Sequence, residues 1–353
     1  MKTLKTVVSG AGRIGWQVHM PGIHSHQGFE LAAVCDPVEE RLQEAREKYG
    51  LNIYTDYYEM LDKEKPDLAV VCSPTHLHME QAIYAMNKGI DVFLDKPMAR
   101  DITEAQKIKD VYEQTGRKLM IYQPMRLYAK NQCLREIIKS GIIGEVFLLK
   151  IGVYDYIHRD DWQAFKKYGG GMINNYGAHQ IDAALYITES TVSKISASMF
   201  SIASAGDADD VVKMLLHTKN NVALDIEINM ASALNLPGTA VYGQHGTIIF
   251  HQDNAINGKT GSYFKARYFE PSKQNRVEAS DSLAAKDRLY ISTQPSEWIE
   301  KDFTFEENDK CDYYNECYKY FALDEKPFVP IEDTMEVMRV IDECRKYAGW
   351  SQD

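Results

Sequence analysis

The feature that most constrains the fold is a glycine-rich turn close to the N-terminus. Residues 10–15 read GAGRIG directly after an apolar run, and Asp36 ends the next apolar run about 20 residues further on. This arrangement is typical of a dinucleotide-binding βαβ unit, in which glycines bring backbone N–H groups against a pyrophosphate. The sequence therefore predicts an N-terminal Rossmann domain. A tight turn without a ligand is the alternative interpretation of the glycines.

Asp36 bears on the choice of dinucleotide. Its carboxylate can accept hydrogen bonds from the adenosine ribose and repels a 2′-phosphate, so we expect NAD as the cofactor. Arg41 lies a few residues further on and can compensate the negative charge of a 2′-phosphate, so NADP is the alternative.

Apolar, β-branched runs alternate with amphipathic stretches over the first third of the chain. The expected strands cover residues 4–9, 31–35, 68–72, 90–94 and 118–121, and the expected helices cover residues 38–49, 75–88 and 103–115. This alternation predicts an α/β domain with a doubly wound parallel sheet. Thr75 is the expected N-cap of the second helix, and Gly89 and Gly116 mark helix ends.

The pattern changes after about residue 144. Alternating stretches predict strands at residues 145–156, 192–202, 211–217, 222–230 and 239–242, and residues 333–347 predict a helix. We expect an α+β domain with a large, mostly antiparallel open sheet. The NAD-binding domain is expected at residues 1–123, and the substrate-binding and oligomerisation domain at residues 124–353, whose last helix can pack back on the first. Residues 252–304 are polar, with at least one strand expected around their aromatic residues.

Composition narrows the class of protein. With 353 residues, 44% of them hydrophobic, the chain can form two domains with separate cores. A net charge of −11 from interspersed residues disfavours nucleic acid and anionic membranes as partners. From its first residues and its apolar runs, we expect no signal peptide and no membrane-spanning stretch. The six cysteines lack a CxxC pair, so we expect reduced thiols, no metal and a cytoplasmic location, with Cys35 and Cys72 in the core.

Several ordered motifs together resemble the glucose–fructose oxidoreductase/inositol dehydrogenase (Gfo/Idh/MocA) family over nearly the whole chain. They are GAGRIG at residues 10–15, SPTHLH at 73–78, DKP at 95–97, GGG at 169–171, NYGAH at 175–179 and KPFVPIED at 326–333. The resemblance implies an NAD-dependent enzyme with a sugar or polyol substrate. It also implies a cis bond before Pro97, and a homodimer or homotetramer that associates through the C-terminal sheet.

The expected chemistry centres on Lys96 and His179. Lys96 follows a strand at the edge where open α/β sheets bind ligands, and it can hydrogen-bond the reacting hydroxyl. His179 is the candidate general acid/base, because imidazole exchanges a proton near neutral pH. A solvated surface lysine and a packing histidine are the alternatives. The preceding glycine run predicts a tight entry to the His179 helix, or else a flexible loop.

The chain departs from the family pattern at several positions. Asp95 replaces the usual Glu, Thr75 an Asn, and Gln163 an Arg. More important, Asn175 stands where the family has an Asp, four residues before the histidine. An amide can orient a hydroxyl or an imidazole, but it holds no negative charge and accepts no proton.

The expected site residues form three groups. The catalytic candidates are Lys96, His179 and Asn175. The cofactor-binding candidates are Gly10, Gly12, Arg13, Ile14, Gly15, Asp36, Ser73, Pro74, His78, Asp95, Lys96, Gln123 and Trp162. The substrate-binding candidates are Lys96, Arg126, Tyr156, His158, Trp162, Asn175 and His179. Packing at the domain junction is the alternative for Gln123 and Arg126, and an ordinary interface for residues 154–162.

Three functions are compatible with these residues. The first is reversible oxidation of a secondary alcohol of a sugar, glycoside or cyclic polyol, with hydride going to the nicotinamide and the proton to His179. The second is redox-neutral glycoside cleavage that retains NAD. The third is a sensor that binds dinucleotide or sugar without catalysis, against which the presence of both Lys96 and His179 argues.

Overall fold

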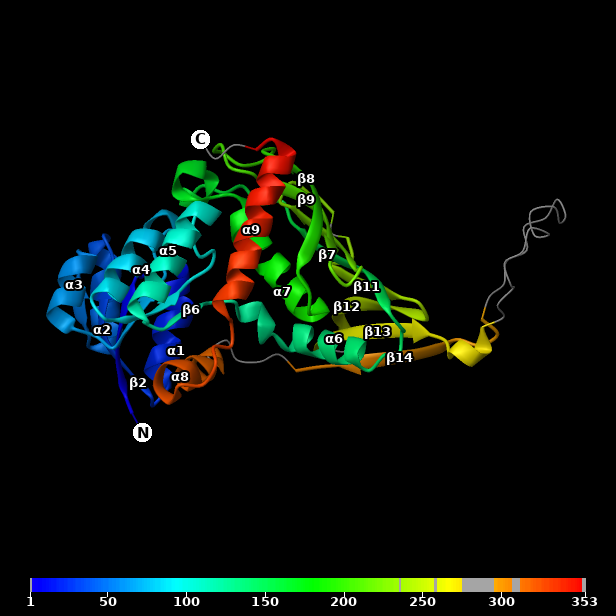
Figure 1. Ribbon diagram of the computed structural model, residues 1–353, viewed down its shortest axis with the longest axis horizontal. Coiled ribbons are helices and arrows are strands. Elements are labelled where there is room, and N and C mark those ends of the chain that lie inside the picture. Colours follow the sequence, from blue (N-terminus) through cyan, green and yellow to red (C-terminus); the bar gives the residue numbers. More distant parts are fainter. Residues whose placement is uncertain (1, 235, 257–258, 275–294, 307–311, 351–353) are drawn as a thin grey trace.

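Two β-sheets with helices on and between them make up the computed structural model, which describes residues 2–234, 236–256, 259–274, 295–306 and 312–350 (Figure 1). The first sheet contains β1 (Leu4–Ser9), β2 (Phe29–Cys35), β3 (Asn52–Tyr54), β4 (Leu68–Val71), β5 (Asp91–Leu94) and β6 (Leu119–Ile121). Its helices are α1 (Met20–Ser25), α2 (Glu39–Tyr49), α3 (Tyr57–Glu64), α4 (His78–Asn87) and α5 (Ile102–Thr115).

The strands of the first sheet are all parallel, in the order β3–β2–β1–β4–β5–β6. Neighbouring residues of β1 face opposite sides, as the strand period requires. Val7 packs in a cluster with residues of α3, α4 and α5, whereas Val8 packs in a second cluster with residues of α1 and α2. Helices therefore cover both faces, which confirms the predicted doubly wound parallel sheet.

Local signals explain most helix ends in this domain. Asp56 and Asp101 cap α3 and α5, because their carboxylates accept from the N–H of Glu59 and Glu104. Gly116 takes the left-handed conformation after α5, as expected. The prediction for Thr75 was wrong: its side chain is buried and makes no capping bond, and Pro74 precedes the short 3₁₀ turn that leads into α4.

The second sheet has eight strands within the described residues, in the order β14–β13–β12–β11–β7–β10–β9–β8. They are β7 (Val146–Tyr154), β8 (Val192–Phe200), β9 (Val211–Thr218), β10 (Ala223–Asn229), β11 (Thr239–Gly243), β12 (Gly246–Ile256), β13 (Lys259–Tyr268) and β14 (Ile299–Thr304). Only the β7–β10 pair is parallel among these strands. The predicted large, mostly antiparallel sheet is confirmed.

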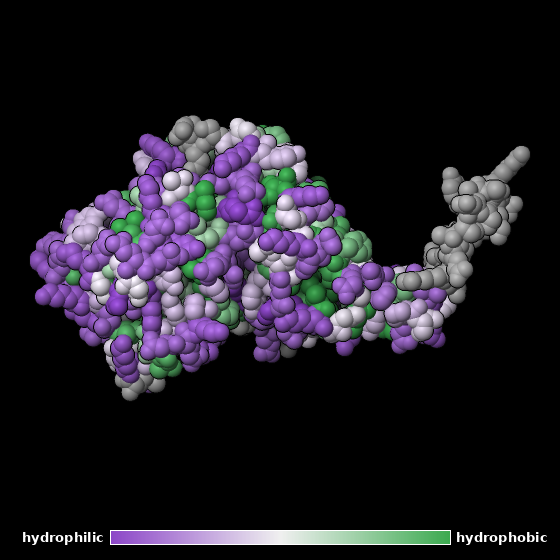
Figure 2. Space-filling view, viewed as in Figure 1, coloured by the Kyte–Doolittle hydropathy of each residue, from purple (hydrophilic) through white to green (hydrophobic). Residues whose placement is uncertain are grey.

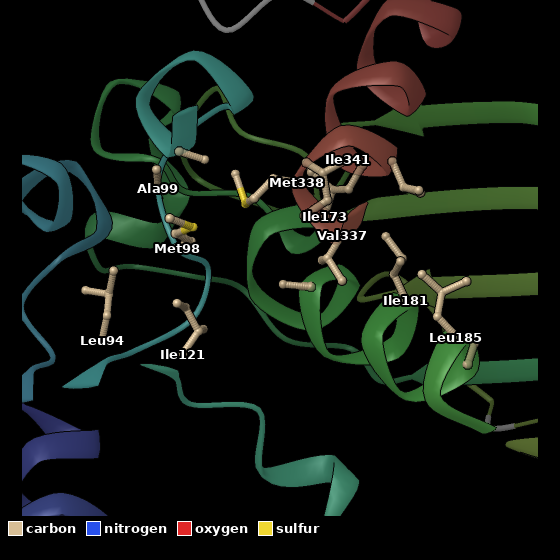
Figure 3. Packing of buried hydrophobic residues seen from close by; sticks show 14 of the residues in the cluster. Leu94, Met98, Ala99, Ile121, Ile173, Ile181, Leu185, Val337, Met338 and Ile341 are labelled. Carbon is tan, nitrogen blue, oxygen red and sulfur yellow. The ribbon is translucent and has the colours of Figure 1, made fainter. Parts of the chain in front are cut away.

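Four further helices are α6 (Ala129–Lys139), α7 (Ala178–Thr188), α8 (Tyr313–Leu323) and α9 (Ile331–Ala348). α9 lies between the two sheets, against α5 on one side and α7 and β8 on the other (Figure 1). Val337, Met338 and Ile341 of α9 belong to the same buried cluster as Met98, next to β5, and Ile181 of α7 (Figure 3). One hydrophobic core therefore continues from the parallel sheet into the second half of the chain.

α8 also returns to the first sheet. Tyr314 and Phe321 of α8 are buried in the cluster that contains Val8 and Phe93. The last part of the chain therefore completes one face of the N-terminal sheet. Among the described helices, none is long and apolar enough to cross a membrane.

Candidate active site

A cavity of about 340 Å³ lies at the carboxyl ends of β1, β2, β4 and β5. Loops between β7 and α7 also line it, at residues 161–163, 169–171 and 174–175. The predicted site residues that line this cavity are Gly10, Gly12, Arg13, Ile14, Asp36, Ser73, Pro74, His78, Asp95, Lys96, Trp162 and Asn175. Strand ends at the point where the strand order reverses are where open α/β sheets bind ligands.

The three glycines of the first turn have different roles. Gly10 has φ +103°, and a Cβ there would lie 2.7 Å from the Cys72 carbonyl oxygen. A Cβ at Gly15 would lie 1.9 Å from the Gly10 carbonyl oxygen, so this glycine packs the turn and does not line the cavity. A Cβ at Gly12 would meet no atom within 4 Å. Gly12 thus leaves open space where a pyrophosphate can approach the backbone, so the turn fits a dinucleotide.

Asp36 is buried and rigidly held at one end of the cavity. Its carboxylate accepts from the N–H of Ala11 at 2.8 Å and from the N–H of Val38 at 3.0 Å. A guanidinium nitrogen of Arg41 lies 3.5 Å from the same carboxylate. The Asp36 carboxylate is therefore held at a fixed position on the cavity wall, and the Arg41 guanidinium lies next to it.

His78 joins the turn after β4 to the turn after β5. Its Nδ1 lies 2.9 Å from the Pro97 carbonyl oxygen and its Nε2 lies 2.8 Å from the Ser73 carbonyl oxygen. Burial lowers the pKa of His78 to about 4, so the ring is neutral and donates to one of these oxygens at a time. The bond before Pro97 is cis, as expected.

Lys96 is half-buried, and its amine is held by one residue. Nζ donates to the backbone carbonyl oxygen and to the side-chain Oδ1 of Asn175, each at 3.0 Å. Burial lowers the pKa of Lys96 to about 8; the Asp95 carboxylate opposes this effect, and Arg13 and Arg159 add to it. The amine therefore titrates close to physiological pH, which suits proton exchange.

The glycine run is a tightly packed entry to the histidine helix and not a flexible loop. A Cβ at Gly170 would lie 2.3 Å from the Gln163 carbonyl oxygen, and one at Gly171 would lie 2.1 Å from a carboxylate oxygen of Asp209. Asp209 accepts from the N–H of Ile173 at 2.7 Å, where a π-helical turn begins. These contacts hold the turn that carries Asn175 against the cavity.

His179 lies at the start of α7, behind this turn, and does not line the cavity. Its Nδ1 is buried and has no hydrogen-bond partner among the described residues. Burial, and next the charge of Lys96, hold the pKa of His179 well below its ordinary value. The imidazole is therefore neutral at physiological pH and electrostatically coupled to Lys96.

The structure places Arg126 elsewhere. Its guanidinium is buried and donates to both carboxylate oxygens of Asp182, at 2.6 and 2.9 Å, and to Asp333 at 2.9 Å. Arg126 lines a second cavity, next to α7 and the start of α9. It therefore ties α7 to α9 and does not reach the first cavity, which agrees with the packing alternative.

Other predicted residues also lie off the cavity wall. Gln123 is buried, and its side-chain oxygen has no partner in the described part of the chain. Tyr156 and His158 are exposed, with ring centroids 5.4 Å apart. Cys72 was expected in the core, but it is half-buried and lines the cavity, where its thiol donates to the Gly10 carbonyl oxygen.

Two positioning residues were missed by sequence reasoning. Gln163 was considered only as a departure from the family pattern, and Asp209 gave no signal because it lies in an irregular stretch far from the glycines. The described cysteines are free thiols, whereas Cys311 lies outside the described residues. Within the described ranges, no three His, Cys, Asp or Glu side chains meet as a metal site.

The parallel sheet, the open glycine turn and the lysine at its edge define a two-domain, dinucleotide-binding protein. The chain belongs to the Gfo/Idh/MocA oxidoreductase family. Residues 4–123 match the model of the oxidoreductase family's NAD-binding Rossmann fold, and residues 131–249 match the model of the GFO/IDH/MocA C-terminal domain.

Similar proteins include dehydrogenases of sugars and polyols. The chain is 31% identical over 188 residues to D-glucoside 3-dehydrogenase of Escherichia coli (strain K12), a match that covers 52% of this chain and only about half, 54%, of that relative. It is 24% identical over 316 residues to myo-inositol 2-dehydrogenase of Thermotoga maritima, covering 86% of this chain and 87% of the relative. The crystal structure of an NAD-binding protein from Listeria innocua, 24% identical, superimposes with a TM-score of 0.79 over 99% of this chain and 95% of that one, which shows the shared fold.

Proposed function

We propose that this protein is an oxidoreductase that moves a hydride between a secondary alcohol of a sugar, glycoside or cyclic polyol and a nicotinamide dinucleotide. The observation that carries the proposal is the position of Lys96. Its oriented amine lines the same cavity as the open backbone at Gly12. A proton-exchanging group beside a dinucleotide site is what alcohol oxidation needs.

The residues along the cavity have different functions in this reaction. Gly12, Arg13 and Asp36 hold the dinucleotide, which when bound takes up the hydrogen of the carbinol carbon with its electron pair. Lys96 hydrogen-bonds the hydroxyl oxygen and stabilises the negative charge that develops on it. Lys96 lines the cavity and His179 lies behind its wall, and these are the two candidates that we propose for exchange of the hydroxyl proton.

We propose NAD as the preferred dinucleotide. Asp36 is fixed by two backbone N–H groups, so its charge cannot move away from a 2′-phosphate. Arg41 is the nearby cation that would bind such a phosphate, and it already contacts the Asp36 carboxylate. Both features favour a ribose with free hydroxyls.

A sugar or cyclic polyol suits the part of the cavity wall that residues 161 and 162 form. Trp162 supplies an aromatic ring and its neighbour Asp161 supplies a carboxylate. Such a mixture fits a ring with apolar C–H faces and a rim of hydroxyls. The glucoside and inositol dehydrogenases among the similar proteins support this class of substrate.

The test is a panel of inositols, monosaccharides and glycosides, with NAD and NADP in turn, followed by absorbance at 340 nm. We expect NADH to form with at least one member, and Lys96→Ala to abolish most of the rate. Absence of nicotinamide reduction with the whole panel contradicts the proposal. Products that form without net NADH would instead indicate redox-neutral cleavage.

A further inference from the structure

The hydrogen bonds of Lys96 leave one position on its nitrogen for a ligand. An ammonium has three N–H groups, and two of them point to the two oxygens of Asn175. A neutral amine has two N–H groups and one lone pair, so the same two bonds leave the lone pair at the third position. Lys96 can therefore both accept and return a proton there without changing its two bonds to Asn175.

This arrangement depends on which way the Asn175 amide points. If the amide were reversed, its NH₂ group would face the amine of Lys96. It would then oppose the N–H groups of the ammonium, or donate to the lone pair of the neutral amine and occupy the position left for a ligand. Gln163 favours the observed orientation, because its Oε1 accepts from Asn175 Nδ2 at 3.1 Å, and a reversed Asn175 amide keeps this bond only if the Gln163 amide reverses as well. The backbone of Gln163 is itself held, since its N–H donates to Asp161 and its carbonyl accepts from the N–H of Gly171, both at 2.9 Å.

We propose that Gln163 is a positioning residue: through the Asn175 amide it orients Lys96, so that Lys96 and not His179 exchanges the proton of the substrate hydroxyl. The inference rests on the proposed function and identifies Lys96 as the group that exchanges the proton in that reaction. In the oxidative direction the O–H bond breaks and its proton goes to the Lys96 amine. The carbinol C–H bond breaks as its hydrogen leaves with both electrons to an oxidised nicotinamide, and the C=O bond forms.

The charges around Lys96 are consistent with this role. The Asp95 carboxylate, which precedes it on the turn after β5, favours its ammonium form, whereas Arg13 and Arg159 disfavour it. The neutral rings of His78 and His179 also interact electrostatically with Lys96. Asn175 adds dipoles but no charge, so it binds the ammonium form less tightly than a carboxylate at the same position would. Because the pKa of His179 is held well below its ordinary value, the imidazole is the weaker base of the two.

The titration of Lys96 can be measured without any substrate. Competitive acetylation with acetic anhydride between pH 6 and 11, followed by mass spectrometry of the Lys96 peptide, gives the midpoint for this single amine. The variants are Gln163→Glu, which keeps an acceptor for Asn175 but adds a charge, and Gln163→Met, which removes the acceptor. The same changes at Gln106, an exposed residue of α5, are the matched controls.

We expect opposite shifts from the two Gln163 variants. Gln163→Glu should raise the midpoint by about half a pH unit, because a carboxylate beyond Asn175 favours the ammonium. Gln163→Met should lower it by about the same amount, because the Asn175 oxygen is no longer fixed on Lys96. The Gln106 variants should leave it unchanged. Equal midpoints in all five proteins overturn the proposal.

Activity provides a second measurement, with myo-inositol and methyl β-D-glucoside as probes. Gln163→Met should lower kcat/KM about 10-fold with unchanged NADH affinity, whereas Gln163→Glu should recover above its raised midpoint. Equal losses in both variants with unshifted pH profiles show a structural role only and overturn the proposal. If the unchanged protein oxidises neither probe, the proposed function fails for these substrates, while the acetylation midpoints still decide the role of Gln163.

Discussion

Replacing Asn175 by Asp gives the most direct test of how the cavity sets the charge of Lys96. The substitution places a carboxylate oxygen where Oδ1 now lies, 3.0 Å from the Lys96 nitrogen. The Gln163 amide can turn and donate to the new carboxylate, so the local packing is preserved. The change is therefore close to a pure addition of one negative charge.

The size of the effect follows from the distance. At an effective dielectric constant of about 20, opposite unit charges 3.0 Å apart attract by roughly 5 kcal/mol. Removing the new carboxylate from water offsets part of this attraction. Opposite charges at such distances commonly change a pKa by about 1 to 3 pH units. We therefore expect the pKa of Lys96 to rise from about 8 by at least about one pH unit.

The sign of the kinetic effect depends on the direction of the reaction. Oxidation needs the neutral amine, so the acid limb of kcat/KM should move to higher pH and the rate at pH 7 should fall about 10-fold for each pH unit. Reduction needs the ammonium, so its alkaline limb should move to higher pH, and activity should extend further into alkali.

The assay is the pH dependence of kcat/KM in both directions, with the acetylation midpoint of Lys96 measured on the same samples. Asn87→Asp at the exposed end of α4 is the control for adding a charge to the surface. Unmoved limbs in both directions, or an unmoved Lys96 midpoint, would refute the reasoning.

Four further predictions follow from the same structure. Lys96→Ala should lower kcat/KM on the order of 10²-fold or more with little change in NADH affinity, and His179→Ala should cost less; the reverse order in steady-state assays would assign the proton to the histidine. Gly12→Ala should weaken NADH binding about 10-fold in a fluorescence titration, and its unfolding temperature should not change because no atom lies within 4 Å of the added Cβ. NADH should bind at least about 10-fold more tightly than NADPH because of Asp36, and equal affinities would contradict this. Figure 2 shows hydrophobic surface over the second sheet, and Phe147, Phe200 and Leu215 are exposed on β7, β8 and β9. Sedimentation should therefore show a dimer or tetramer at micromolar concentration that Leu215→Glu weakens; a monomeric unchanged protein would count against it.

Much of the fold was predictable because local patterns of apolar and polar residues indicate most of its strands and helices. Buried parallel strands appear as continuous apolar runs, and alternating strands with one covered face appear as a two-residue period. The strands and helices up to residue 121 agree with the prediction within a few residues. β3 and α3 were missed, and α1 was given no bounds. β3 has only three residues and shows no apolar run.

The sequence by itself determined the glycine turn, the acid that ends β2 and the lysine after β5, since each follows from a motif within a short stretch of chain. Tertiary structure decided which side chains meet at the cavity. Lys96 and Asn175 are 79 residues apart, and no local spacing shows that both oxygens of one residue hold the amine of the other. The tertiary structure also pairs Arg126 with Asp182 and places Gln163 next to Asn175. A buried polar group binds whichever partner the packed chain brings within hydrogen-bond distance, and the sequence does not show which partner that is.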